Sequence, residues 1–229
     1  MGRPRDLVLE NLAEIRRRIS VACESAARDP SEIAVVAIGK TVEAEALRWV
    51  VEAGVRDLGE NYVQELRAKV GEVPGARWHF VGTLQSSSAH HVADLVSVVE
   101  TVVPGRAAER LARRASGAAR TIPVLVEVDF TAQRSGVRAE ETVSACDQVA
   151  ALEGLELRGL MTVPPPSDTA EAARPYFERL RTLRDDVADR HPGAIELSMG
   201  MSLDYEVAVG EGATMVRIGT ALFGARPRA

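Results

Sequence analysis

Apolar residues recur along this chain in two patterns that follow each other from one end to the other. Between residues 6 and 28, Leu9, Leu12, Ile15 and Ile19 are spaced by three or four positions, which predicts an amphipathic helix. Asp29-Pro30 then ends the helix, and a short apolar run follows, of the kind that forms a buried strand. The rest of the chain repeats this alternation.

Short apolar runs predict strands that are separated by helical patterns. The strands are expected at residues 33–40, 55–59, 78–81, 95–99, 122–128, 156–161, 195–197 and 214–218. The helices between them are expected at residues 43–53, 61–70, 88–93, 106–116, 140–152 and 170–190, with a short one after Ser202.

Strict alternation of strands and helices implies a parallel sheet with right-handed crossovers, and eight such units in 229 residues suggest closure. We therefore predict an α/β fold: a single (β/α)8 TIM-type barrel with an extra N-terminal helix, forming one domain over residues 1–229. Little chain follows the last strand, so the N-terminal helix is expected to cover the side that a final helix would otherwise cover. The rival, an open doubly wound sheet, lacks its GxGxxG fingerprint after the first strand.

The composition narrows the classes of function. A hydrophobic content of 46% with 27% charged residues is that of a globular protein, no apolar run is long enough to span a membrane, and the first residues lack a signal-peptide core, so we expect a cytoplasmic protein. The net charge of −5 argues against non-specific nucleic-acid binding. Cys23 and Cys146 match no metal-ligand spacing and are expected to be free buried thiols.

The first strand ends in Lys40, one of only two lysines among 28 basic residues. A desolvated lysine amine can lose its proton and attack a carbonyl, whereas arginine stays protonated and forms no Schiff base. Lys40 is therefore the first candidate for chemistry. The alternative is that Lys40 is a solvated loop residue and that the excess of arginine reflects genomic base composition.

The loops after the last two strands have the composition of a phosphate site. In a barrel of this type the site lies at the carboxyl ends of the strands, and the loops after strands seven and eight often hold phosphate. Ser198, Gly200 and Ser202 follow the seventh strand, and Gly219 and Thr220 follow the eighth. We expect Ser202 to open a helix whose free amides can face an anion.

Arg217 lies on the same face of the eighth strand as Met215 and Gly219. A buried arginine needs an acceptor, which a ligand could supply. Together with Lys40 and the two loops, Arg217 would suit pyridoxal 5'-phosphate (PLP): the lysine forms the internal aldimine, the loops take the phosphate, and the arginine faces the ring nitrogen.

Several longer motifs resemble the pyridoxal-phosphate homeostasis protein family over essentially the whole chain. They are GK-T at 39–41, GENYVQE at 59–65, WHFVGTLQS at 78–86, GLMTVPPP at 159–166, LSMGMSLDYEVAVGEG at 197–212 and MVRIGTALFG at 215–224. The resemblance implies a barrel like the N-terminal domain of bacterial alanine racemase, with the cofactor on Lys40. It also implies Asn61 near the ring, Arg217 at the ring nitrogen, and a group of residues around the phosphate: Ser198, Gly200, Ser202, Gly219 and Thr220.

Two motifs depart from the pattern of the family. Gly39 and Val42 stand where relatives commonly have Ser and a second Lys, and Gln85-Ser86-Ser87-Ser88 stands where many have Gln-Ser-Asn-Lys. Both departures remove amines near the mouth of the barrel. These two motifs therefore offer no second lysine through which the cofactor could be handed out.

The resemblance implies a PLP-binding protein that buffers the cofactor, or delivers it to apo PLP-dependent enzymes, as a monomer or weak dimer without robust catalysis. The alternative is a PLP-dependent amino-acid racemase or lyase, which usually needs a second base opposite the lysine. Tyr62, Tyr205 and His79 are the candidate bases, and for each we favour a structural role. A third class, a barrel enzyme acting on a phosphorylated sugar without PLP, would use the same phosphate loops.

Overall fold

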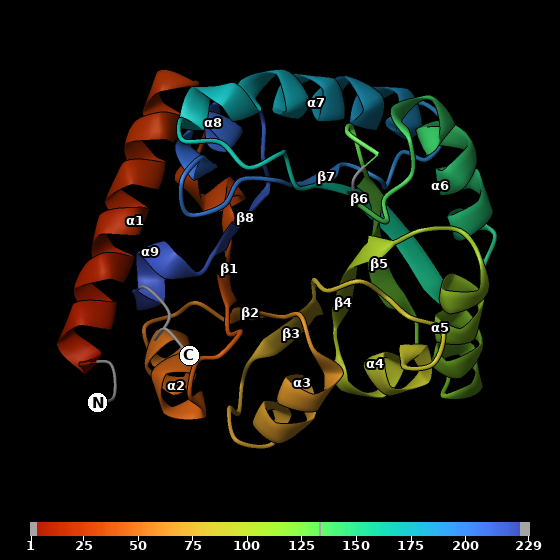
Figure 1. Cartoon of the computed structure of the whole chain (residues 1–229), viewed down its shortest axis with the longest axis horizontal. Coiled ribbons are helices and arrows are strands. Elements are labelled where there is room, and N and C mark those ends of the chain that lie inside the picture. The colour runs from red at the N-terminus through yellow and green to blue at the C-terminus, as the bar shows by residue number, and fades with distance from the viewer. Residues whose placement is uncertain (1–3, 133, 225–229) are drawn as a thin grey trace.

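Eight parallel strands close into a barrel in which each strand pairs with the next and β8 pairs with β1 (Figure 1). The structure, a computed structural model, describes residues 4–132 and 134–224. The (β/α)8 TIM-type barrel is thereby confirmed. The strands are β1 (Ala34–Ile38), β2 (Asp57–Glu60), β3 (Arg77–Phe80), β4 (Val98–Val102), β5 (Ile122–Val128), β6 (Leu155–Thr162), β7 (Glu196–Ser198) and β8 (Met215–Ile218).

Helices surround the barrel, as Figure 1 shows. The extra N-terminal helix α1 packs against α2, α8 and α9, beside the pair formed by β8 and β1. Asn11 of α1 donates a hydrogen bond to the carbonyl of Leu222 (3.0 Å). The helices are α1 (Arg5–Ser25), α2 (Ala44–Glu52), α3 (Val63–Val70), α4 (Ala89–Leu95), α5 (Arg106–Gly117), α6 (Thr142–Ala150), α7 (Arg174–Ala188), α8 (Tyr205–Gly210) and α9 (Thr220–Phe223), with single 3₁₀ turns η1 (Pro30–Glu32), η2 (Ala139–Glu141) and η3 (Ala170–Ala173).

The alternation of side chains along each strand divides the core into two layers. Outward residues pack under the helices in one large hydrophobic cluster, and an inner cluster forms around Val36, Leu125, Met161 and Met215. None of the helices in the described part of the chain is both long and apolar enough to cross a membrane. The rest of the barrel interior is polar, and this polar part connects to the site.

Two expectations about element boundaries were wrong, and one helix was missed. β4 spans Val98–Val102 rather than 95–99, because α4 continues to Leu95 and Val96 still donates to the carbonyl of Val92 (3.1 Å). The short helix α9 was not predicted. Ser202 does not open α8, which begins at Tyr205, because the Asp204 carboxylate accepts from the Met201 amide (2.6 Å) and folds the intervening residues into a turn.

Candidate functional site

A cavity of about 440 Å³ lies at the carboxyl ends of the strands. This volume is in the range of small-molecule sites. Apolar side chains, among them Ile38, Val81 and Met161, form part of its wall. Six of the eight residues predicted to bind the cofactor line it: Lys40, Asn61, Ser202, Arg217, Gly219 and Thr220.

Lys40 stands on the loop after β1. Its side chain is half-buried, and its Nζ lies 4.8 Å from the centroid of the Tyr62 ring. The backbone on either side is fixed, because the Thr41 amide donates to Glu65 Oε2 (2.8 Å) and the carbonyl of Gly39 accepts from the Val42 amide (2.8 Å). The amine is thus presented to the cavity from a loop whose backbone is tied down.

Lys69, the second lysine, lies buried beneath this loop. From α3 its Nζ donates to Glu60 Oε1 (2.6 Å), to Glu65 Oε2 (2.7 Å) and to the carbonyl of Gly39 (2.8 Å). Glu60 is fully buried, and burial raises its pKa in spite of the ion pair with Lys69. The two lysines therefore serve the same loop, one as a candidate reactive amine and the other as its support. Sequence reasoning had assigned no role to Lys69.

Asn61 follows β2, and its backbone lies against Gly82 in the loop after β3. A Cβ atom on Gly82 would lie 2.0 Å from the carbonyl oxygen of Asn61, so only glycine lets the two backbones pass this closely. Thr101 Oγ1 donates to the carbonyl of Gly82 (2.5 Å) and holds that segment from the other side. These backbone contacts hold Asn61 in the wall of the cavity, which Lys40 also lines.

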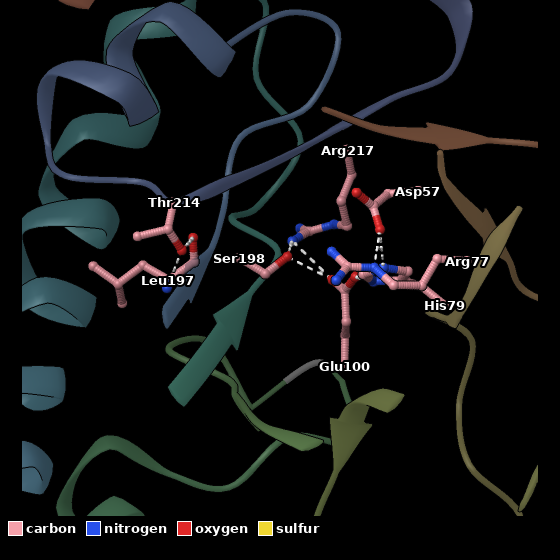
Figure 2. A network of polar contacts seen from close by, with 8 residues as sticks. All are labelled: Asp57, Arg77, His79, Glu100, Leu197, Ser198, Thr214 and Arg217. Atoms are coloured by element: carbon pink, nitrogen blue, oxygen red, sulfur yellow. Dashed lines mark hydrogen bonds and ion pairs between the residues drawn. The ribbon is translucent and has the colours of Figure 1, made fainter. Parts of the chain in front are cut away.

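Arg217 on β8 is almost fully buried and has protein acceptors (Figure 2). Its Nη1 donates to Ser198 Oγ (2.5 Å) and its Nη2 to the carbonyl of Thr162 (2.7 Å). Ser198 Oγ in turn donates to Glu100 Oε2 (2.5 Å). The guanidinium does not need a ligand to supply its acceptors, contrary to the reasoning from sequence.

His79 continues this network inside the barrel (Figure 2). Its Nδ1 lies 2.6 Å from Glu100 Oε1 and its Nε2 lies 2.9 Å from Asp57 Oδ1, which also contacts Arg77. Burial opposes a charged imidazole, but the hydrogen bonds and charges of Asp57 and Glu100 outweigh burial and raise the pKa of His79 to about 9. His79 is therefore a satisfied buried cation, as favoured from the sequence, and not a free base.

The raised pKa of His79 makes part of the stability dependent on pH. Since the pKa rises on folding from 6.5 to about 9, protonated His79 contributes its full stabilisation below about pH 6.5 and loses it as the pH rises through about 9. At 1.36 kcal/mol per pKa unit this amounts to about 3 kcal/mol. Urea unfolding at pH 6, 7.5 and 9.5 measures the free energy of unfolding of the wild type and of His79→Gln. The difference between the two free energies should become smaller as the pH rises. A difference that stays constant across this range would contradict the assignment.

Two of the predicted cofactor residues do not line the cavity. Ser198 is fully buried and bonded to Arg217 and Glu100. Gly200 has a φ of +91°, and a Cβ atom there would lie 2.5 Å from Ala208 Cβ, so α8 packs directly on its backbone. The structure thus gives both residues a packing or network role.

The remaining phosphate-loop residues lie together at the rim of the cavity. Ser202 Oγ accepts from the amides of Gly219 (3.3 Å) and Ala221 (3.1 Å), which joins the loop after β7 to the loop after β8. Thr220 is exposed. The expected convergence of these two loops is therefore present, although Ser202 reaches the start of α9 and not that of α8.

The other candidate groups do not line the cavity. Tyr205 is buried under Arg18, whose guanidinium lies 5.5 Å from the centre of its ring, while Tyr62 is about half-exposed with its ring against Lys40 Nζ. Cys23 and Cys146 are free and buried, and burial raises the pKa of Cys146 to about 12. In residues 4–132 and 134–224 no cluster of His, Cys, Asp and Glu could hold a metal ion.

Sequence reasoning missed several polar residues near the site. Arg134, on the loop after β5, lines the cavity, and its Nε lies 3.2 Å from Glu127 Oε1. Glu100 and Glu127 are buried acids within the apolar strands VVETV and IPVLVEV. A charged residue inside an otherwise apolar strand was the available signal, because such a residue needs a partner within the barrel.

Known proteins resemble this chain along almost its whole length. Residues 11–227 match the family model for the N-terminal domain of alanine racemase. A pyridoxal phosphate homeostasis protein from Pseudomonas aeruginosa is 40% identical over 96% of both chains. The solved structure of PipY from Synechococcus elongatus PCC7942 with PLP bound superposes with a TM-score of 0.83 at 32% identity, covering 95% of this chain and 100% of PipY. An alanine racemase from Clostridium difficile 630 shares the fold (TM-score 0.77, 16% identity, 97% of this chain and 58% of the racemase).

Proposed function

Because the chain belongs to the pyridoxal-phosphate homeostasis protein family, we propose that it binds PLP in the cavity at the carboxyl ends of the strands and holds it as a Schiff base on Lys40. The observation that carries the proposal is the meeting of Lys40, Arg217 and the loops after β7 and β8 at one cavity of about 440 Å³. These groups come from β1, β7 and β8, and β8 pairs with both of the others in the closed barrel.

The residues of the cavity fit the chemical parts of PLP. Lys40 Nζ would be the amine that holds the aldehyde group, with loss of one water when the C=N bond forms. Ser202, Gly219 and Thr220 would offer hydroxyl and amide groups to the phosphate, and Arg217 would offer a fixed cation to the ring nitrogen. Ile38 and Met161 offer apolar surface to the ring. When bound, the cofactor supplies a reactive aldehyde and an electron-withdrawing ring.

The same cavity favours holding the cofactor over turning over a substrate. Among the described residues that line it there is no histidine, tyrosine or cysteine that could act as a second base opposite Lys40, and Tyr62 turns the face of its ring to Lys40 Nζ. His79 is sealed between two carboxylates, and Tyr205 is buried. We propose that the protein buffers PLP in the cytoplasm as a monomer or weak dimer and passes it to apo PLP-dependent enzymes, without robust catalysis of its own.

The visible spectrum of the protein with added PLP tests this proposal. A yellow band that borohydride removes, followed by a peptide map with the pyridoxyl group on Lys40, is the expected result. The map is simple to read because Lys40 and Lys69 are the only lysines. Protein that stays colourless with PLP, or label confined to Lys69, would overturn the proposal, and racemisation of an amino acid by the loaded protein would overturn its non-catalytic part.

A further inference from the structure

A continuous chain of polar contacts crosses the interior of the barrel. It runs from Arg217, which lines the cavity at the carboxyl ends of the strands, through Ser198 and Glu100 to His79 and Asp57 (Figure 2). His79 lines a second cavity, of about 430 Å³, at the amino ends of the strands. The contacts therefore connect the cofactor end of the barrel with its opposite end.

The directions of the hydrogen bonds follow from the chemistry of the groups at Arg217 and Ser198, and from the pKa shifts at His79 and Glu100. A guanidinium has only donors, so Ser198 Oγ must accept from Arg217 and can give its single hydrogen to Glu100 Oε2. The contacts at His79 fit two arrangements: a doubly protonated ring that donates to ionised Glu100 and Asp57, or a neutral ring that accepts from a protonated Glu100 and donates to Asp57. Although burial opposes both charges, the hydrogen bond between His79 and Glu100 raises the pKa of His79 and lowers that of Glu100, which favours the first arrangement.

We propose that Glu100 and Ser198 are positioning residues that fix the place and the effective charge of Arg217 at the PLP ring, with His79 and Asp57 holding Glu100 ionised. The proposal rests on the proposed function for its ligand. Glu100 Oε2 lies 4.0 Å from Arg217 Nη1 and is fully buried, so its charge acts on the guanidinium in a medium that screens it weakly. Burial of Arg217 lowers its pKa, and the charge of Glu100 opposes that shift.

The charged groups around His79 come from several strands. Asp57 approaches from β2 and Glu100 from β4, while Arg77 lies on β3 with His79 itself. Glu196 of β7 lies on the wall of the same cavity as His79 and is paired with Arg158 of β6. If His79 lost a proton, the carboxylates of Asp57 and Glu100 would no longer have a cation between them. The change in charge at Glu100 would then alter its contact with Ser198, and through Ser198 the position of Arg217.

Two substitutions break the chain of contacts at different points. Ser198→Ala removes the link between Arg217 and Glu100 with little change in volume, and Glu100→Gln removes the charge at constant shape. Each should weaken PLP binding about tenfold, the change expected for losing a hydrogen bond to a charged group, and shift the absorption maximum of the bound cofactor. The matched control is His191→Gln. His191 Nε2 lies 2.8 Å from Asp147 Oδ1, so this variant also replaces a partly buried histidine that contacts a carboxylate, but one outside the barrel interior.

A second readout needs no cofactor. In the protein without PLP, ¹⁵N NMR should show both nitrogens of the His79 ring protonated at pH 8, and Glu100→Gln should lose that state while shifting the Arg217 guanidinium signals. Ser198→Ala should shift the Arg217 signals and leave His79 protonated. A purely structural role for Glu100 would lower the melting temperature without moving the Arg217 signals or the cofactor spectrum.

The outcomes separate this inference from the proposed function. If the wild type binds PLP and both variants match its affinity and spectrum, the positioning role is wrong. If the wild type fails to bind PLP, the proposed function fails, and unchanged Arg217 signals in the variants would then overturn the positioning role independently. If Glu100→Gln does not fold, Ser198→Ala alone decides the result, since it deletes only one hydroxyl.

Discussion

Protein carrying Lys40→Ala is expected to form no covalent adduct with PLP and to stay colourless at cofactor concentrations that turn the wild type yellow. Its cavity would keep Arg217, Ser202 and Thr220, so that phosphate and ring contacts remain but no C=N bond can form. Absorbance after desalting measures the retained cofactor, and borohydride followed by mass spectrometry measures the covalent part.

The stability of the same variant provides its control. The described contact of the Lys40 amine is with the Tyr62 ring, an interaction worth about 0.5–1 kcal/mol at exposed sites, so the unfolding curve should move only slightly. A yellow, borohydride-sensitive Lys40→Ala protein would show that another amine carries the cofactor. Lys69 would then be the first residue to examine, because it lies beneath the same loop.

Replacing Lys69 by methionine is expected to lower the free energy of unfolding by about 3–5 kcal/mol, the cost of removing one partner from a buried ion pair. The substitution leaves Glu60 fully buried without its cation and frees the carbonyl of Gly39 from its contact with Nζ. Because the pKa of Glu60 is already raised by burial, the lost cation should raise it further and make the variant least stable at high pH. Urea unfolding at pH 5.5 and 8 measures both effects.

Two further variants test the cause of that loss. Glu60→Gln combined with Lys69→Met removes the stranded charge and should recover part of the stability. Lys40→Met, the same substitution at the only other lysine, should cost far less, since that side chain is half-buried and its amine is at the cavity. Equal destabilisation by the two methionine substitutions would contradict the role given to Lys69.

The fold could be predicted from sequence because its signal is local and repeated. Each apolar run and each helical pattern is complete within a few residues, and the regular alternation leaves few topologies. The period of two along 214–218 also grouped Arg217 with Met215 and Gly219 on one face, which in the structure is the inward one, and strand order alone brought Gly219 and Thr220 to the mouth. β4 was misplaced because Leu95 to Val99 reads equally well as an apolar strand or as the end of a helix.

The polar network could not be predicted, because its members are far apart in the sequence. Ser198 and Glu100 are 98 positions apart, and Lys69 is 30 positions from the carbonyl it supports at Gly39. No periodic pattern encodes which buried acid meets which donor across a barrel. This is also why Ser198, a hydroxyl in the expected phosphate loop, could not be distinguished by sequence from Ser202, which does line the cavity.

The bond between Asn11 and Leu222 joins residues 211 positions apart, and the segment it holds, α9, begins at a residue of the cavity wall. No residue of α1 lines the cavity, yet α1 holds the helix whose first turn forms part of the cavity wall. Local unfolding of α1 would therefore release α9 and open the wall at Gly219 and Thr220 while the strands of the barrel stay paired.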